Sequence, residues 1–356
     1  MLGSIITVLI FFSALATFIF AISKNFLTQK VKRIGLKGKH VLITGGSKGI
    51  GKALAIQAAQ KGAHVTILAR NFEDLQKTKK ELQTLCDLNV FEKDLPGQKV
   101  LALQCDLASN YELVATAVET AEREMGPVDV LINNVGSSQP GAFDQLPIDA
   151  FERQMRINYI SAVYATRAVV PSMKKRTNPN GRIVLLSSQA GQIGLWGYTA
   201  YSASKFALKG FAEALQMELT PHDIRVTVVF PPDTDTEGFA VEQTTTPAQT
   251  RMLTESSGIW TPKDLAKVVW DDVRDGRHYS TLGWNGWMMG VLTSGMSPET
   301  DGALVMQETF LMGVFRLITI GVLWNFDRIL AKMAKQEKSN ISKDKIPETV
   351  DEENSN

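Results

Sequence analysis

The sequence predicts a doubly wound parallel α/β sheet, because short apolar runs alternate with longer segments that have helical periodicity and more charge. Six runs are rich in Val, Ile and Leu and hardly alternate with polar residues, which is typical of strands buried on both faces. These runs cover residues 40–44, 64–69, 100–105, 128–133, 182–187 and 225–230, and a seventh short strand is expected at 278–283.

The segments between the apolar runs suit crossover helices on the two faces of the sheet. They cover residues 71–86, 109–125, 149–175 and 203–219. Residues 87–98 contain Asp87, Asn89, Pro96 and Gly97 and are predicted to form a surface loop. The predicted α/β domain spans residues 39–283.

The composition excludes several functions. A chain of 356 residues with 44% hydrophobic and 21% charged residues can bury a large core. A net charge of +1 argues against nucleic acid as a partner, because phosphate-backbone binding uses a strong basic excess. The two cysteines, Cys86 and Cys105, and four scattered histidines predict a reducing compartment and no protein-bound metal.

The N-terminal residues 1–23 are predicted to form a membrane anchor. The stretch from Leu2 to Ser23 carries no charge and, as a helix, matches a hydrocarbon core of roughly 30 Å. A cleavable signal peptide is the alternative, but the apolar run is longer than an ordinary signal core. The linker at 24–38 is basic, so the positive-inside bias places the following domain on the cytosolic face.

The apolar region at 284–331 is expected to associate with the membrane. The uncharged stretch 279–298 is too short to cross once the last strand is subtracted, and Arg316 interrupts the stretch 309–326. We expect two helices that lie in, or dip into, the cytosolic leaflet. The alternative is a helix pair buried between copies of the chain in a homo-oligomer. Residues 332–356 are expected to form a polar cytosolic tail.

A glycine-rich loop follows the first predicted strand and opens a helix. Glycines at such a loop let the backbone turn tightly and approach a pyrophosphate at the positive end of the helix. The loop is TGGSKGIG at 44–51, and its candidate cofactor ligands are Gly45, Ser47, Lys48, Gly49, Ile50 and Gly51.

The predicted cofactor is NADP(H). An acidic residue at the end of the second strand would bind the ribose hydroxyls of NAD, but this chain has Arg70 there. Together with Lys48 in the glycine loop, Arg70 supplies positive charge for a 2′-phosphate. Either residue alone could be a solvated surface charge.

Other candidate ligands follow the third, fourth and sixth strands, at the carboxyl edge where such sheets bind ligands. They are Asp106, Leu107, Asn134, Gly136 and Pro231. The polar residues among them could instead only cap turns.

Tyr201 and Lys205 are the candidate reactive pair. They are four residues apart, so on a helix they share one face, where the ammonium can lower the pKa of the phenol. Ser188 ends the fifth strand and can meet them across the cleft. An ordinary exposed helix pair is the alternative, and the surrounding motifs argue against it.

These motifs resemble those of the short-chain dehydrogenase/reductase superfamily over residues 39–283. The resemblance implies a Rossmann-type fold, and it implies that Tyr201 is the general acid or base and that Lys205 is its electrostatic partner and a ribose ligand. It also implies that Ser188 orients the substrate oxygen and that Asn158 anchors a proton-relay water. The matching residues are TGGSKGIG at 44–51, Asp106, NNVG at 133–136, Asn158, Ser188, Tyr201 and Lys205.

A closer resemblance is to the 3-ketodihydrosphingosine reductase family, carried by the anchor, the run 187–219 and the segment 231–236. It implies reduction of a long-chain keto-base lipid with NADPH in sphingolipid synthesis, at the endoplasmic reticulum membrane. Glu73 and Asp74 stand where that family carries a basic residue, which leaves Arg70 and Lys48 as the phosphate ligands. A retinoid or steroid dehydrogenase, or a catalytically silent nucleotide- or lipid-binding protein, are the alternatives.

The connection at 237–260 is long for this fold and is predicted to form a lid over the substrate, with a solvent loop as the alternative. Asp233 and Asp235 precede it. They are expected either to face solvent or to pair with the amino group of a sphingoid base.

Overall fold

The computed structural model describes eight positions between residues 6 and 21 and residues 31–93, 97–176, 180–255, 258–299 and 301–344. The predicted anchor at 1–23 and the end of the tail, 345–356, therefore lie largely or wholly outside the described residues. Within the described part, seven parallel strands form one sheet in the order β3-β2-β1-β4-β5-β6-β7, which confirms the predicted sheet. The strands are β1 (His40–Thr44), β2 (His64–Ala69), β3 (Val100–Gln104), β4 (Val130–Asn133), β5 (Arg182–Leu186), β6 (Arg225–Phe230) and β7 (Tyr279–Thr281).

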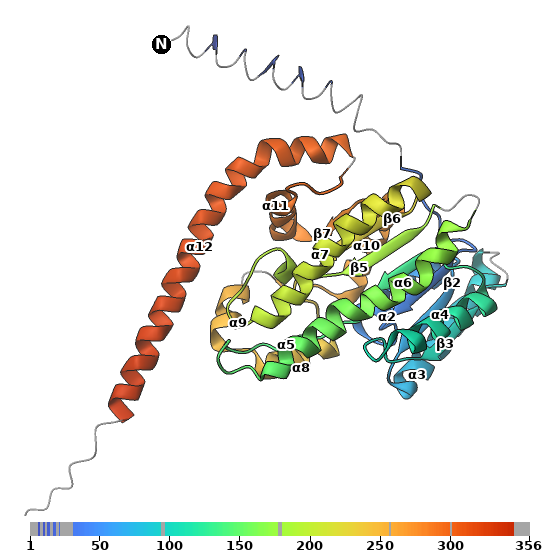
Figure 1. Cartoon of the computed structure of the whole chain (residues 1–356), viewed down its shortest axis with the longest axis horizontal. Coiled ribbons are helices and arrows are strands. Elements are labelled where there is room, and N and C mark those ends of the chain that lie inside the picture. The colour runs from blue at the N-terminus through green and yellow to red at the C-terminus, as the bar shows by residue number, and fades with distance from the viewer. Residues whose placement is uncertain are drawn as a thin grey trace, which may run out of the picture.

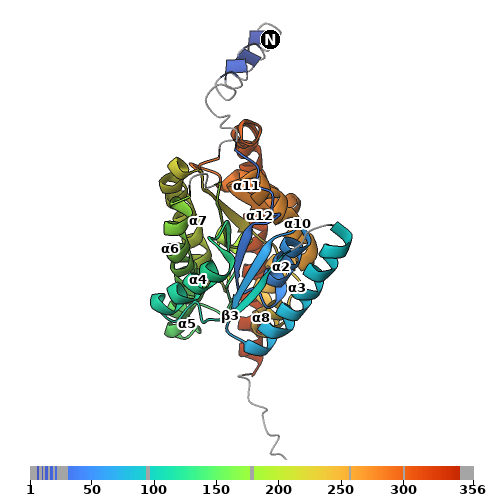
Figure 2. The ribbon, with the colours of Figure 1, turned by 90° about the vertical axis from the view of Figure 1, so that its right-hand side faces the viewer.

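Helices cover both faces of the sheet, as Figure 2 shows in a view along the layers. Helices α2, α3 and α10 lie on one face, and α4, α6 and α7 lie on the other. Their bounds, with the short α5, are α2 (Gly49–Gln60), α3 (Phe72–Lys93), α4 (Tyr111–Met125), α5 (Ile148–Met155), α6 (Ser161–Lys174), α7 (Thr199–Leu219) and α10 (Pro262–Asp275). This is the three-layer arrangement expected when parallel strands are connected by helices.

The central strands are buried on both faces because each side of the sheet has its own core. In β1, Val41 and Ile43 belong to the core under α2 and α10, whereas Leu42 belongs to the core under α6 and α7. All three side chains are fully buried. Each is worth roughly 1.5–3 kcal/mol of burial free energy, which explains why the strand sequence is apolar without alternation.

The loop predicted at 87–98 is wrong in its local structure, whereas the long connection predicted at 237–260 is present and includes helices. The loop predicted at 87–98 begins late, because α3 continues to Lys93. Asp87 does not end the helix, since its carboxylate accepts a hydrogen bond from Gln83 one turn earlier, and the strong helix breakers come only at Pro96 and Gly97. The connection predicted at 237–260 contains two helices, α8 (Glu237–Thr245) and α9 (Ala248–Thr254).

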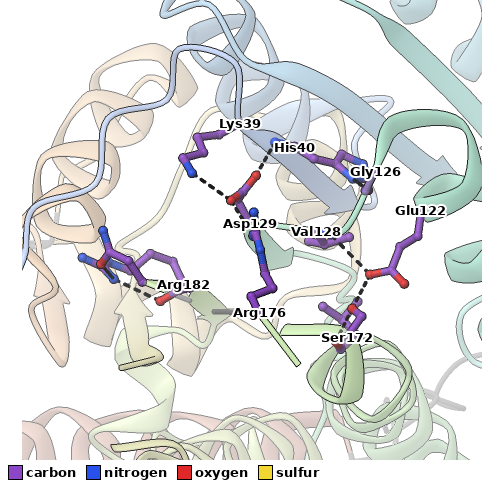
Figure 3. Close-up of polar contacts among 12 residues, drawn as sticks. Lys39, His40, Glu122, Gly126, Val128, Asp129, Ser172, Arg176 and Arg182 are labelled. Atoms are coloured by element: carbon purple, nitrogen blue, oxygen red, sulfur yellow. Dashed lines mark hydrogen bonds and ion pairs between the residues drawn. The ribbon is translucent and has the colours of Figure 1, made fainter. Parts of the chain in front are cut away.

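The amino-terminal edge of the sheet carries a buried ionic network, drawn in Figure 3. Asp129, just before β4, accepts hydrogen bonds from Lys39 Nζ at 3.1 Å, Arg176 Nη1 at 2.5 Å and the main-chain N–H of His40 at 2.9 Å. The His40 ring lies between the Gly126 carbonyl at 2.7 Å and the Thr66 hydroxyl at 2.9 Å. Every group here has a partner within the chain, so the network joins β1, β4 and α6.

Two C-terminal helices follow the sheet, α11 (Gly283–Thr293) and α12 (Gly302–Asp344). Among the described residues, the stretch Gly302–Gln336 of α12 is the one long and apolar enough to cross a membrane, and little of it is buried. Figure 1 shows α12 along one side of the α/β unit, where it packs on α11 and α9. Phe315 contacts Trp287 and Trp284 of α11 with ring centroids 5.1 and 6.0 Å apart.

Candidate active site

A cavity of about 710 Å³ opens at the carboxyl-terminal edge of the sheet. Its floor comes from the segments that follow β1, β4, β5 and β6, and its walls come from α7, α8, α9, α11 and α12. The predicted site residues that line it are Lys48, Ile50, Asn134, Gly136, Ser188, Tyr201, Lys205 and Pro231. The structure thus brings together residues from five separate sequence segments at the edge where doubly wound sheets bind ligands.

The glycine loop has the shape that a pyrophosphate requires. Gly45 and Gly49 have φ angles of +64° and +53°, in the left-handed region that favours glycine. A Cβ atom on Gly51 would lie 2.3 Å from the Gly45 carbonyl oxygen, so only glycine fits there. The free N–H groups at the start of α2 face the same loop. The backbone of the loop therefore has the conformation that dinucleotide binding requires.

Ser47 contributes to the loop through its main chain. Its carbonyl oxygen accepts a hydrogen bond from the Thr78 hydroxyl of α3 at 2.8 Å. This contact fixes the loop against α3, and Ser47 lies beneath the lining of the cavity rather than in it.

The two predicted phosphate ligands differ in their surroundings. Lys48 Nζ lies 2.9 Å from Asp74 Oδ2 and 2.8 Å from Glu237 Oε2, and both carboxylates raise its pKa. Arg70 is exposed just beyond β2, outside the cavity lining. A 2′-phosphate held by both residues would therefore lie at the outer rim, and it would compete with Asp74 and Glu237 for Lys48.

Asp106 and Leu107 follow β3 and lie outside the cavity lining. The Asp106 carboxylate accepts a hydrogen bond from the Ala108 N–H at 3.0 Å, so in this structure it caps a turn. Leu107 is buried in the core beneath α4.

Asn134 and Gly136 follow β4 and connect the glycine loop to the reactive pair. The Asn134 amide donates to the Gly45 carbonyl at 3.0 Å. A Cβ on Gly136 would lie 3.1 Å from Lys205 Nζ and 3.2 Å from Asn158 Oδ1. A side chain at position 136 would therefore crowd the Lys205 ammonium. Glycine at this position lets the backbone after β4 lie close to that ammonium.

Tyr201 and Lys205 lie on one face of α7, as the four-residue spacing predicts. Lys205 Nζ lies 5.6 Å from the centroid of the Tyr201 ring and donates to the Leu186 carbonyl at 2.9 Å. Ser188, directly after β5, forms a side-chain hydrogen bond with Tyr201. The hydroxyl, phenol and ammonium thus form one cluster at the end of β5.

Asn158 lies behind this cluster, in a π-helical segment, Arg156–Ile160, between α5 and α6. Its amide nitrogen donates to the Ser137 carbonyl and the Ser204 hydroxyl, and its amide oxygen accepts from the Ser137 N–H. The side chain is buried and fixes the segment after β4 against α7. π-Helical turns of this kind occur often at functional sites.

Burial dominates the titration of the reactive pair. It lowers the pKa of Lys205 to about 8, and burial together with the nearby Glu242 carboxylate raises the pKa of Tyr201. The sequence predicts a lowered pKa for the phenol, and that prediction is wrong for this structure because desolvation of the phenolate outweighs the ammonium. The phenol is therefore protonated at neutral pH, which is the form that donates a proton.

Sequence reasoning missed two residues of the site, Tyr198 and Glu242. The Tyr198 hydroxyl donates to Glu242 Oε1 at 2.6 Å, and the rings of Tyr198 and Tyr201 lie 5.3 Å apart between centroids. The three-residue spacing of Tyr198, which precedes α7, and Tyr201 in its first turn was an available signal. Glu242 lies on α8, and its place could not be predicted from a local pattern. Asp233 lines the cavity, but Asp235 is exposed outside it.

Among the described residues, no three His, Cys, Asp or Glu side chains are placed to hold a metal ion. The two cysteines are buried as free thiols, and burial raises the pKa of both.

Residues 39–246 match the family described as short chain dehydrogenase. The chain belongs to this family. It is therefore an oxidoreductase, and the Ser188–Tyr201–Lys205 cluster lies within the matched range.

Several relatives within the family match nearly the whole chain. A zebrafish (Danio rerio) protein named 3-dehydrosphinganine reductase is 44% identical over 88% of this chain and 92% of its own. A bovine (Bos taurus) 3-ketodihydrosphingosine reductase is 44% identical over 86% of this chain and 90% of its own. An Arabidopsis thaliana 3-dehydrosphinganine reductase is 33% identical over 96% of this chain and 99% of its own.

Solved structures agree with the fold of the family. A short chain dehydrogenase from Burkholderia cenocepacia in complex with NADP superposes with a TM-score of 0.57 at 29% identity, covering 67% of this chain and 92% of that one. A 3-ketoacyl-(acyl-carrier-protein) reductase from Brucella melitensis complexed with NADH gives 0.57 at 25% identity, covering 67% and 91%. These solved structures cover two thirds of this chain, whereas the three relatives above cover between 86% and 96% of it.

Proposed function

We propose that this protein uses NADPH to reduce 3-ketodihydrosphingosine, a long-chain 2-amino ketone, to sphinganine. The observation that carries the proposal is the Ser188–Tyr201–Lys205 cluster in a cavity whose α11 and α12 walls are mostly apolar. Relatives named 3-dehydrosphinganine reductase and 3-ketodihydrosphingosine reductase match this chain over most of its length.

Tyr201 is proposed as the general acid. When bound, the nicotinamide supplies a hydride to the carbonyl carbon, and the Tyr201 hydroxyl donates its proton to the carbonyl oxygen, which together give the alcohol. Ser188 shares a hydrogen bond with Tyr201 and orients the same carbonyl oxygen. Lys205 then stabilises the phenolate that is left behind, since its ammonium lies over the edge of that ring.

Lys205 also suits the return of a proton to Tyr201. Its pKa of about 8 is close to neutral, so the ammonium can give up and regain a proton near working pH. Asn158 is proposed to anchor the relay water and acts as a positioning residue, because its amide fixes the segment beside Lys205. The cofactor is proposed to lie along the glycine loop, with Asn134, Gly136 and Pro231 beneath it.

The preference for NADPH is proposed to come from Lys48 and Arg70. Lys48 lines the cavity and Arg70 lies just beyond β2 outside it, on the side where the adenosine ribose lies in this fold. Asp106 and Leu107 are proposed to border the adenine.

Association with the membrane is proposed to involve α12, in addition to the N-terminal segment. Thr319, Val322 and Phe326 of α12 line the cavity, while Leu317 on another side of the helix is 72% exposed. This arrangement favours a helix that lies in the cytosolic leaflet of the endoplasmic reticulum with the catalytic domain in the cytosol. A lipid substrate would then enter beside α12 without leaving the bilayer surface.

The function can be tested with the full-length protein in detergent. NADPH consumption is measured with 3-ketodihydrosphingosine, retinal and a ketosteroid at equal concentrations. We expect the keto base to give the highest kcat/KM. Faster turnover of retinal or the steroid would replace the substrate assignment while retaining the dehydrogenase.

The topology can be tested on intact microsomes by adding protease and probing the C-terminal tail. We expect the tail to be digested without detergent, because a helix lying in the cytosolic leaflet leaves it outside the lumen. A tail protected until detergent is added would show that α12 crosses the membrane.

A further inference from the structure

The cavity has two chemically different ends. Near Tyr201 it is lined by Ser188 and the carboxylates of Asp233 and Glu242. Away from Tyr201, it is lined by apolar side chains of α11 and α12, among them Met288 and Phe326. A ligand that fits both ends has a positively charged head beside the reacting carbonyl and a long aliphatic tail.

Glu242 is held next to the proton donor. Its Oε1 accepts the Tyr198 hydroxyl at 2.6 Å, and the side chain of Ser138 lies close enough to lower its pKa. Tyr198 in turn contacts the Tyr201 ring at 5.3 Å between centroids. These contacts fix the carboxylate at the head of the cavity, where it is largely buried.

Glu242 and Asp233 have no cationic partner in the described part of the chain within the 4.0 Å that defines an ion pair. The cavity has two lysines, and both are engaged elsewhere. Lys48 pairs with Asp74 and Glu237, and Lys205 donates to the Leu186 carbonyl. Lys205 attracts the Glu242 carboxylate from a longer distance and lowers its pKa. Neither acid at the head of the cavity, however, has a cation in direct contact among the described residues.

The titration of both acids is consistent with this arrangement. Burial raises the pKa of Glu242, and burial together with the Glu242 carboxylate raises the pKa of Asp233 to about 6. Such shifts arise when carboxylates lack a positive partner in a desolvated site. A bound cation would lower both pKa values, because it stabilises the ionised carboxylates. The ionised site should therefore bind a cationic ligand more tightly than a neutral one.

We propose that Glu242, assisted by Asp233, is the counter-ion for the ammonium group of the substrate. The inference rests on the proposed function, because in a 2-amino ketone the ammonium carbon is bonded to the carbonyl carbon. A proton donor on the carbonyl oxygen and a counter-ion on the ammonium must therefore lie side by side, as Tyr201 and Glu242 do. Ketones without this amino group leave the carboxylates unpaired, which selects against them.

The test compares two ketones of equal chain length, one with the 2-amino group and one without it. In Glu242→Gln the amide oxygen can still accept the Tyr198 hydroxyl, so the variant removes charge with little change of shape. We expect KM for the amino ketone to rise about 10- to 100-fold, while kcat/KM for the amine-free ketone stays the same or rises. Asp233→Asn should give a smaller change in the same direction.

Asp235→Asn is the matched control, because Asp235 is exposed outside the cavity and differs from Asp233 by two positions. It should leave both substrates unchanged. Equal losses for the two ketones in Glu242→Gln, or equal effects of Asp233→Asn and Asp235→Asn, would overturn the inference.

Equilibrium binding of a saturated long-chain amine, measured without turnover, separates this inference from the proposed function. If the wild-type protein reduces neither ketone, the proposed function fails, and the binding measurement still decides the role of Glu242. Wild-type binding that weakens about tenfold or more in Glu242→Gln supports the counter-ion. Unchanged binding of the amine, or equally tight binding of the alcohol of the same length, contradicts it.

Discussion

The two edges of the sheet treat buried carboxylates in opposite ways. At the amino edge, Asp129 is 4% exposed and has two cations and a main-chain N–H as partners (Figure 3). At the carboxyl edge, Glu242 accepts a hydrogen bond from Tyr198 but has no cation within ion-pair distance among the described residues. The first arrangement stabilises the fold, whereas the second leaves charge for a ligand. Substitutions at the two edges should therefore affect different measurements.

The largest expected effect is at the carboxyl edge, in Tyr201→Phe. This variant removes the proposed proton donor and keeps the ring that packs on Tyr198. We expect kcat to fall about 10²–10⁴-fold, with NADPH binding and the unfolding temperature unchanged. Steady-state kinetics, a cofactor-binding titration and thermal unfolding measure the three quantities. Activity within tenfold of the parent would contradict the role of Tyr201.

At the amino edge, Asp129→Ala should reverse this pattern. Removing the carboxylate leaves Arg176 and Lys39 close together, and it leaves the His40 N–H without its acceptor. We expect a loss of about 3 kcal/mol in the free energy of unfolding, measured with denaturant, because a buried pair is broken from one side. The kcat of the folded protein should not change.

The control for Asp129 is Asp149→Ala, because Asp149 pairs with Arg153 on the surface, where the side chains are 65% and 45% exposed. Its loss should be below about 1 kcal/mol, as for most exposed pairs. Equal losses for the two variants would show that burial of Asp129 does not set its contribution.

Sequence reasoning succeeded where the signal is local. The runs 40–44, 64–69 and 225–230 coincide with β1, β2 and β6, since buried parallel strands need continuous apolar residues. The four-residue spacing of Tyr201 and Lys205 is also a local signal, because residues four apart lie on one face of a helix.

Contacts between distant segments could not be predicted in this way. Glu242 reaches Tyr198 across 44 positions, and Glu237 reaches Lys48 across 189. The direction of the Tyr201 pKa was wrong for the same reason, because it depends on how the whole fold desolvates the phenol. A sequence shows which groups are present at an edge, whereas their charge balance depends on tertiary packing.

The comparison also predicts opposite pH dependences for the two edges. Burial lowers the pKa of His40 from 6.5 to about 4, so its contribution to stability is complete above pH 6.5 and is lost as the pH falls toward 4. From pH 7 to pH 5 this costs about 2 kcal/mol in the free energy of unfolding. Asp233 has a raised pKa, from 3.8 to about 6, and its destabilising effect is relieved as the pH falls through 6.

Denaturant unfolding at pH 7 and pH 5 measures both effects. His40→Gln should reduce the loss of stability at pH 5, and Asp233→Asn should increase it, because each variant removes one of the two opposing groups. His278 also has a pKa lowered to about 4, so part of the loss remains in His40→Gln. Slopes that are identical in all three proteins would mean that neither group titrates differently on folding.

The smallest expected effect concerns Lys48, a cation at the carboxyl edge that pairs with two carboxylates. Asp74 and Glu237 both hold its ammonium, so a 2′-phosphate must compete with them. Asp74→Asn should therefore raise the ratio of kcat/KM for NADPH over NADH, by about two- to fivefold, since the pair is partly exposed. Glu73→Gln is the matched control, because it makes the same charge change one residue away, where the side chain is exposed. An unchanged ratio in Asp74→Asn would show that Lys48 does not read the phosphate. The same rise in both variants would show that net charge, rather than the contact with Lys48, sets the preference.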